Sequence, residues 1–172
     1  AAMVIGACGG GVSGLSRTEI GQIANEVETS LDDWHDAAAR GDFERYFAHF
    51  SDAGMFLGTD ATERWSVAEF RDYAREPFSD GEGWVMRSVR RSVRVSSAGD
   101  VAWFEEDLET VNLGPCRGSG VFVLEAGRWK IAQYNLTITV PNERFAEVRS
   151  LLSNPALDGE GSGAGADPAD AP

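Results

Sequence analysis

Residues 118–140, GSGVFVLEAGRWKIAQYNLTITV, decide the fold of this 172-residue chain. Aliphatic, β-branched and aromatic side chains dominate two runs within this stretch, 118–125 and 129–140. The dipeptide Ala126-Gly127 lies between the two runs and is typical of a tight hairpin turn. We therefore predict two antiparallel strands joined by a short turn.

Two further β-type runs, 84–95 and 101–111, precede this hairpin. Residues 96–100, SSAGD, have the composition of a turn and separate the two runs. Gly114-Pro115 then breaks the chain before the hairpin begins. The second half of the chain is thus predicted to be a meander of four antiparallel strands.

The first half of the chain shows helical periodicity. Residues 16–19, SRTE, have the spacing of a capping box, and Gly41 ends the helix that follows. A short strand is expected at 54–58, and residues 66–69, SVAE, form a second capping box. Helices followed by a strand meander predict an α+β domain, with the helices on one face of a curved antiparallel sheet. The apolar stripe of the first helix is Ile20, Ile23, Val27, Leu31, Trp34 and Ala38.

Composition excludes several classes of function. The formal net charge of −13 repels phosphate backbones and anionic headgroups, so we expect no nucleic-acid partner. Two cysteines are too few for a disulfide framework, and no apolar run is long enough to span a membrane. The sequence contains no His/Cys metal spacing, phosphate loop or dinucleotide motif, so neither a metal nor a cofactor is predicted.

The two ends differ from the middle, which gives three segments: a start and linker at 1–15, a globular domain at 16–152, and a disordered acidic tail at 153–172. Residues 5–8, IGAC, resemble a bacterial lipobox, in which Cys8 would carry a lipid anchor. A frayed terminus with an incidental cysteine fits equally well. The predicted location is the bacterial cell envelope if Cys8 is lipidated, and the cytoplasm otherwise.

Several segments resemble the SnoaL-like family of the nuclear-transport-factor-2-like, ketosteroid-isomerase-like superfamily. They are residues 49–60, 102–106, 117–120, 127–137 and 141–143, and the resemblance covers about residues 20–150. It implies a cone-shaped domain with helices packed on the concave face of the sheet and a pocket beneath it. The superfamily includes isomerases, cyclases, dehydratases and proteins that only bind, so the resemblance does not decide the function.

Glu106 is the first candidate for chemistry. Strand alternation places it on the more apolar face with Phe104 and Leu108, where a carboxyl needs a partner or a raised pKa. We expect it to pair with Arg117 at a pocket wall, either as a structural ion pair or as a catalytic one. The arginines of 87–94 should form cross-strand ion pairs, with Arg91 facing Glu106 or Asp107.

Asp60 is the second candidate. Ketosteroid isomerase is an enzyme whose active-site pKa values are tuned by their surroundings, and an aspartate near this part of the fold is its general base. The tyrosine of that site lies on the first helix, where this chain has Trp34 and His35 instead. The favoured interpretation of Asp60 is a turn residue that accepts a side-chain-to-backbone hydrogen bond. His35 is expected to be solvated on the outer side of its helix.

Two functions fit these residues. The first is a small-molecule-binding or accessory domain for an apolar or aromatic ligand. The alternative is an isomerase- or cyclase-type enzyme with Glu106 or Asp60 as general base. The expected ligand-binding residues are Trp34, Phe47, His49, Trp65, Glu106, Arg117, Tyr134 and Asn135.

Parity and surface apolarity give two more expectations. Tyr134 and Asn135 point to opposite faces of a regular strand, so at most one should reach the cavity. The alternate sets of the last strand are both apolar, one with Ile131 and Gln133 and the other with Ala132 and Leu136. We therefore predict a homodimer that covers the outer face.

Overall fold

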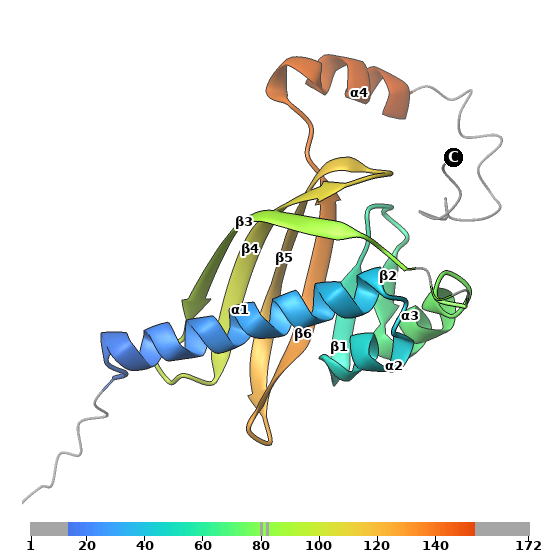
Figure 1. Ribbon diagram of the computed structural model, residues 1–172. Coiled ribbons are helices and arrows are strands. Elements are labelled where there is room, and N and C mark those ends of the chain that lie inside the picture. The colour runs from blue at the N-terminus through green and yellow to red at the C-terminus, as the bar shows by residue number, and fades with distance from the viewer. Residues whose placement is uncertain (1–13, 80, 82, 154–172) are drawn as a thin grey trace, which may run out of the picture.

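The computed structural model describes residues 14–79, 81 and 83–153 (Figure 1). It confirms the predicted α+β class, with a mostly helical first half followed by a strand meander. The elements are α1 (Arg17–Ala39), α2 (Phe43–Ala48), β1 (Phe50–Leu57), β2 (Arg64–Ser66), α3 (Val67–Ala74), β3 (Met86–Val95), β4 (Val101–Thr110), β5 (Gly114–Glu125), β6 (Arg128–Ile138), the 3-10 turn η1 (Asn142–Arg144) and α4 (Phe145–Leu152).

One curved sheet with the strand order β2-β1-β6-β5-β4-β3 carries the domain. The predicted meander of β3 to β6 is confirmed as antiparallel throughout. However, β1 pairs with β6 in parallel, so the expectation of a wholly antiparallel sheet holds only in part. No hairpin joins β1 to β6, because residues 58–127 lie between them, and their relative direction is therefore not set by a turn.

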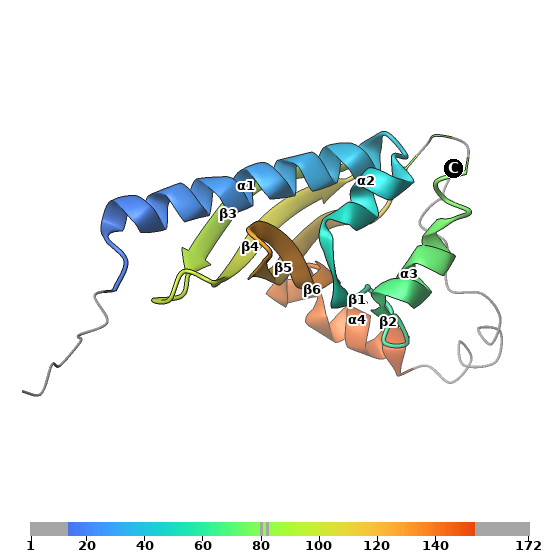
Figure 2. The same ribbon diagram turned by 90° about the horizontal axis from the view of Figure 1, so that it is seen from below.

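Helix α1 lies across the concave face of the sheet, as Figures 1 and 2 show from two directions. Its predicted stripe is buried at Val27, Leu31 and Trp34. Both predicted capping boxes are present, at Ser16 and Glu19 before α1 and at Ser66 and Glu69 before α3. These hydrogen bonds satisfy backbone donors that the first helical turn leaves free.

A β-bulge in β6 changes which side chains face the core. Phe122 of β5 pairs with Ile131 and Val121 pairs with Gln133, so Ala132 is one extra residue on β6. Ile131 and Tyr134 are consequently buried on the same side of the sheet. The predicted alternate sets of this strand were therefore wrong, because strict alternation cannot continue through an inserted residue.

The two ends of the chain bear on other predictions. Residues 1–13 and 154–172 lie outside the described part, so the lipid anchor at Cys8 and the disordered tail stay predictions. None of the described helices combines the length and apolar composition that crossing a membrane requires. Helix α4 follows η1 and stands beyond the end of the sheet, away from α1 (Figure 1).

Candidate functional site

A cavity of about 320 Å³ lies between the β1–β2 connection, α3 and the ends of β3 and β6. Its aromatic wall is Phe56, Trp65, Phe70, Tyr73 and Trp84, and its aliphatic wall is Met86, Leu113, Leu136 and Ile138. Gly58, Thr59, Asp60 and Glu63 complete the lining. A largely apolar concavity with a few polar groups is the usual form of a small-molecule site.

Local structure sets the aromatic wall in place. Ser66 is both the last residue of β2 and the N-cap of α3, so Trp65 lies next to Phe70 on the helix. Their ring centroids are 5.6 Å apart, and the ring planes differ by 7°. Phe70 in turn stacks on Trp84 at 5.8 Å and 8°. The indole Nε1 of Trp84 is buried without a hydrogen-bond partner among the described residues. This wall therefore has near-parallel ring faces.

The charged part of the lining comes from the turn between β1 and β2. Asp60 Oδ1 accepts a hydrogen bond from the backbone N–H of Thr62 at 2.7 Å, which confirms the interpretation of Asp60 as a turn residue. The side-chain and backbone hydrogen bonds of Thr62 hold the pKa of Asp60 below its ordinary value. Glu63 Oε2 accepts from the backbone N–H of Asp60 at 3.1 Å.

A separate network surrounds Glu106, whose side chain is fully buried between α1 and the sheet. Oε1 of Glu106 lies 2.8 Å from His35 Nε2, and Oε2 accepts from Arg91 Nε at 3.0 Å. The hydroxyl of Tyr134 donates to Oε1 at 3.3 Å. Nη1 of Arg91 continues to Asp32 Oδ1 at 2.7 Å, so the network joins α1, β3, β4 and β6.

The electrostatics of this network favour an ionised carboxylate. Burial by itself would raise the pKa of Glu106, but the hydrogen bond with His35 and the charges of His35 and Arg91 outweigh burial and lower that pKa. Burial, followed by the nearby charge of Glu106, raises the pKa of Tyr134 well above its ordinary value. None of these side chains lines the aromatic cavity.

The predicted pairing of Glu106 with Arg117 was wrong. Register explains the error, because Arg117 pairs with Asp107 and Glu106 lies opposite Gly118. Successive residues of a strand face opposite sides, so Arg117 points away from Glu106 and approaches Asp107 at 3.6 Å. The expectation for Arg91 is confirmed, since Arg91 lies directly across from Glu106.

The prediction that His35 is solvated was also wrong, since only 9% of its surface is exposed. Helix α1 lies flat against the sheet, so its buried face is wider than the stripe ending in Trp34 and Ala38. A wider apolar face is normal for a helix that packs on a sheet. The neighbouring acidic residues of α1 remain at its outer edge, where Asp33 and Asp36 bind Arg45.

The structure places the remaining predicted ligand residues in different parts of the domain. Trp65 lines the cavity, whereas Trp34 and Phe47 lie in the aromatic core. The ring of His49 contacts Asp33 and Ser30 on α1. Parity holds as expected: Tyr134 faces Glu106, and Asn135 points to the other side, where it donates to Thr137.

Sequence reasoning missed Glu63 and Trp84 as lining residues. Glu63 lies in a polar turn and Trp84 lies just before β3, and neither position by itself marks a cavity. The second capping box could have indicated this part of the cavity. It begins α3 shortly after Trp65, so the aromatic side chains of α3 lie against the β1–β2 region.

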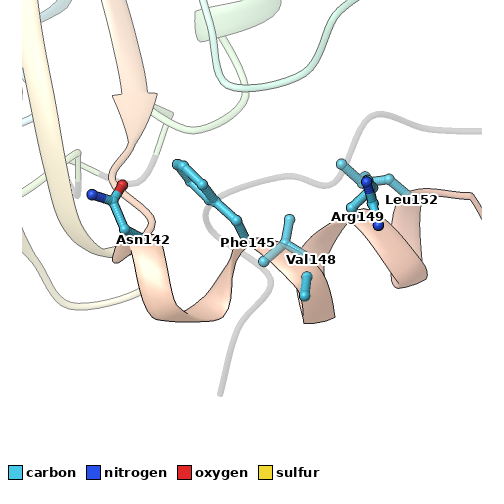
Figure 3. Close-up of a pocket in the computed structure, with 6 residues that line it drawn as sticks. Asn142, Phe145, Val148, Arg149 and Leu152 are labelled. Atoms are coloured by element: carbon cyan, nitrogen blue, oxygen red, sulfur yellow. The ribbon is translucent and has the colours of Figure 1, made fainter.

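A second hollow runs along the surface of α4 (Figure 3). It is lined by Asn142, Phe145, Ala146, Val148, Arg149 and Leu152. Its one charged group is Arg149, and within the described residues no three His, Cys, Asp or Glu side chains are placed to hold a metal ion. The lining of this hollow is thus mainly apolar, with Asn142 and Arg149 as its polar side chains.

Comparison with known proteins identifies the type of domain. Residues 27–141 match a family model described as a SnoaL-like domain. No curated protein sequence matches the chain.

Solved structures share the fold. A Nostoc punctiforme domain of unknown function with a cystatin-like fold has 18% identity, a TM-score of 0.63, and coverage of 84% of this chain and 93% of its own. An NTF2-like protein of unknown function from Pseudomonas putida has 11% identity, a TM-score of 0.60 and coverage of 72% and 91%. A candidate dehydratase of the NTF2-like family from Streptomyces avermitilis has 16% identity, a TM-score of 0.59 and coverage of 70% and 99%. At these identities the likeness concerns the fold alone.

Proposed function

This chain belongs to the SnoaL-like domain family, and we propose that it is a small-molecule-binding domain that holds an apolar or aromatic molecule in the cavity beside α3. The observation that carries the proposal is the composition of the cavity. Stacked aromatic and aliphatic side chains form its walls, and the carboxylates among its described lining residues come from the exposed β1–β2 turn. Such a site binds by burying apolar surface.

The isomerase- or cyclase-type alternative needs a carboxylate that can take a proton from a bound molecule. Glu106 is held by His35, Arg91 and Tyr134, and lies outside the cavity lining. Asp60 does line the cavity, but its hydrogen bonds with Thr62 lower its pKa and make it a weak base. The geometry therefore supports binding over proton transfer.

The test uses N-phenyl-1-naphthylamine, a neutral aromatic probe whose fluorescence rises in an apolar site. We expect saturable enhancement with the wild-type chain. Ile138→Trp should abolish it, because Ile138 lines the cavity and a larger side chain there fills the space.

Leu124→Trp is the matched control. Leu124 is 42% exposed and Ile138 is 43% exposed, both lie in strands, and Leu124 is not part of the cavity lining. This variant should bind the probe as the wild type does. Equal binding by the two variants would place the probe elsewhere, and an absence of saturable binding by the wild type would refute the proposed function.

A further inference from the structure

We propose that the cavity selects organic cations: molecules with an aromatic or apolar ring system that enters the cavity and a protonated amine that stays at its charged edge. This inference rests on the proposed binding function and adds the chemical class of the ligand. It is carried by three features of the lining, namely two unpaired carboxylates, their fixed positions, and the ring faces beside them.

The charge of the lining has one sign. Asp60 and Glu63 are its two carboxylates, and no lysine, arginine or histidine belongs to it among the described residues. A formal net charge of −13 for the whole chain adds a field that attracts cations and repels anions. An anionic ligand would therefore enter against both the local and the overall charge.

These two carboxylates are left open, in contrast to three acids of β4 that bind arginines. On β4, Glu106 binds Arg91, Asp107 binds Arg90, and Glu109 pairs with Arg87. Within the part of the chain that the structure describes, no basic side chain forms an ion pair with Asp60 or Glu63. Their charges are thus available to a ligand.

The turn also holds the carboxylates in place. Asp60 Oδ1 accepts from both the backbone N–H and the hydroxyl of Thr62, the latter at 2.5 Å. The side chain of Glu63 lies over Gly58, another lining residue, and a Cβ added at Gly58 would collide with it. Because Gly58 has no side chain, the Glu63 carboxylate can lie against the edge of the cavity.

The aromatic wall supplies the complementary surface. Trp65 stacks on Phe70 at 7° and on Tyr73 at 26°, so several ring faces share nearly one orientation. Ring faces carry a partial negative charge and attract cations, most strongly in tryptophan. A ligand that combines a ring with an ammonium group would use both the wall and the carboxylates.

Three ligands of one shape and different charge test the proposal: naphthalen-2-ylmethylamine, naphthalen-2-ylmethanol and naphthalene-2-carboxylate. Calorimetric titration at pH 7 and low salt should give a Kd for the protonated amine about tenfold lower than for the alcohol, since each attraction alone is modest. The carboxylate should bind more weakly than the alcohol. Added salt should reduce the advantage of the amine.

The double variant Asp60→Asn/Glu63→Gln should remove the preference for the amine, so that the amine and the alcohol bind with similar Kd values. Asp52→Asn/Glu105→Gln changes the net charge equally, outside the cavity lining, and should keep most of the preference. Equal affinity of the wild type for amine and alcohol would overturn the cation proposal and leave the binding function intact. Failure of all three ligands to bind would instead count against the binding function itself.

Discussion

The carboxylate of Glu106 forms hydrogen bonds or ion pairs with side chains of α1, β3 and β6. Each of these partners is at least 15 positions away in the sequence, so the network exists only in the folded domain. Removing one side chain of this buried network leaves the charge of its partner buried without an opposite charge. The cost is then the desolvation of the remaining charge rather than the strength of one contact.

We expect Arg91→Ala to lower the free energy of unfolding by about 3–5 kcal/mol, because it leaves Glu106 buried without its arginine. Urea unfolding of Arg91→Ala, Glu106→Ala and the double variant should show strong coupling, with the double variant more stable than the sum of the single effects predicts.

Arg117→Ala provides the control for this cycle. Arg117 lies beside Asp107 on the other face, so its effect and that of Glu106→Ala should add within about 0.5 kcal/mol. Additive effects of Arg91→Ala and Glu106→Ala would contradict the network described above.

His49 and Glu106 should each contribute to the loss of stability in acid, in separate pH ranges. Burial lowers the pKa of His49 from 6.5, despite its hydrogen bond with Asp33, so the unfolded chain binds this proton more readily than the folded domain. The contribution of His49 is full above about pH 6.5 and is lost as the pH falls through its folded pKa. Glu106 has a lowered pKa relative to 4.5, so its contribution is full above that value and is lost at more acidic pH.

Urea unfolding across this range tests the assignment. His49→Gln should flatten the change in stability just below about pH 6.5, and Glu106→Gln should flatten it below about pH 4.5. Each variant serves as the control for the other. If either substitution altered both ranges equally, the assignment of these steps to His49 and Glu106 would be incorrect.

At the scale of elements, local signals determine where helices and strands begin, and tertiary packing determines how they face. The box at Ser66 and Glu69 begins α3 directly after β2, and this single junction brings Trp65 and Phe70 together. The extra residue Ala132 acts over a longer distance, because it turns both Ile131 and Tyr134 towards the core. Without that bulge, regular alternation would place Tyr134 on the face opposite to Ile131.

At the scale of the whole molecule, the structure changes the surface through which we expect the homodimer to form. The outward residues of β6 now include Gln133, Asn135 and Thr137, which are polar, so β6 offers little reason for association. Helix α4 does, because Phe145, Leu151 and Leu152 are exposed on it. The charges of the one glutamate and the one arginine of α4 cancel, whereas the whole chain has a formal net charge of −13. Two copies can approach there with less repulsion than elsewhere.

We predict a dimer at micromolar concentrations by light scattering, with α4 in the interface. Phe145→Glu/Leu152→Glu should shift the chain to a monomer, because it places charges on the apolar surface of α4. Leu124→Glu, an exposed site at the β5–β6 turn, should leave the dimer unchanged. A monomeric wild-type chain under these conditions would contradict the prediction.

Much of the fold was predictable because the responsible interactions are short in sequence. A capping box spans four residues, and the turn at Ala126-Gly127 needs only two residues with positive φ, 48° and 77°. The pairing of Arg91 with Glu106 follows from one turn and a count of residues along two adjacent strands. Such signals are sufficient for the α+β class, the meander and the buried face of β4.

Sequence patterns alone predict the two capping boxes, the four-strand meander and the side of β4 on which Glu106 lies. Tertiary packing is needed to make β1 run parallel to β6, to bury His35, and to bring the Asp60–Glu63 turn and Trp84 to one cavity. The physical reason is that these contacts join segments with no short connection between them. Their geometry depends on how the sheet curves, where β6 bulges and how α1 and α3 pack. A short sequence pattern does not predict the combined result of these effects.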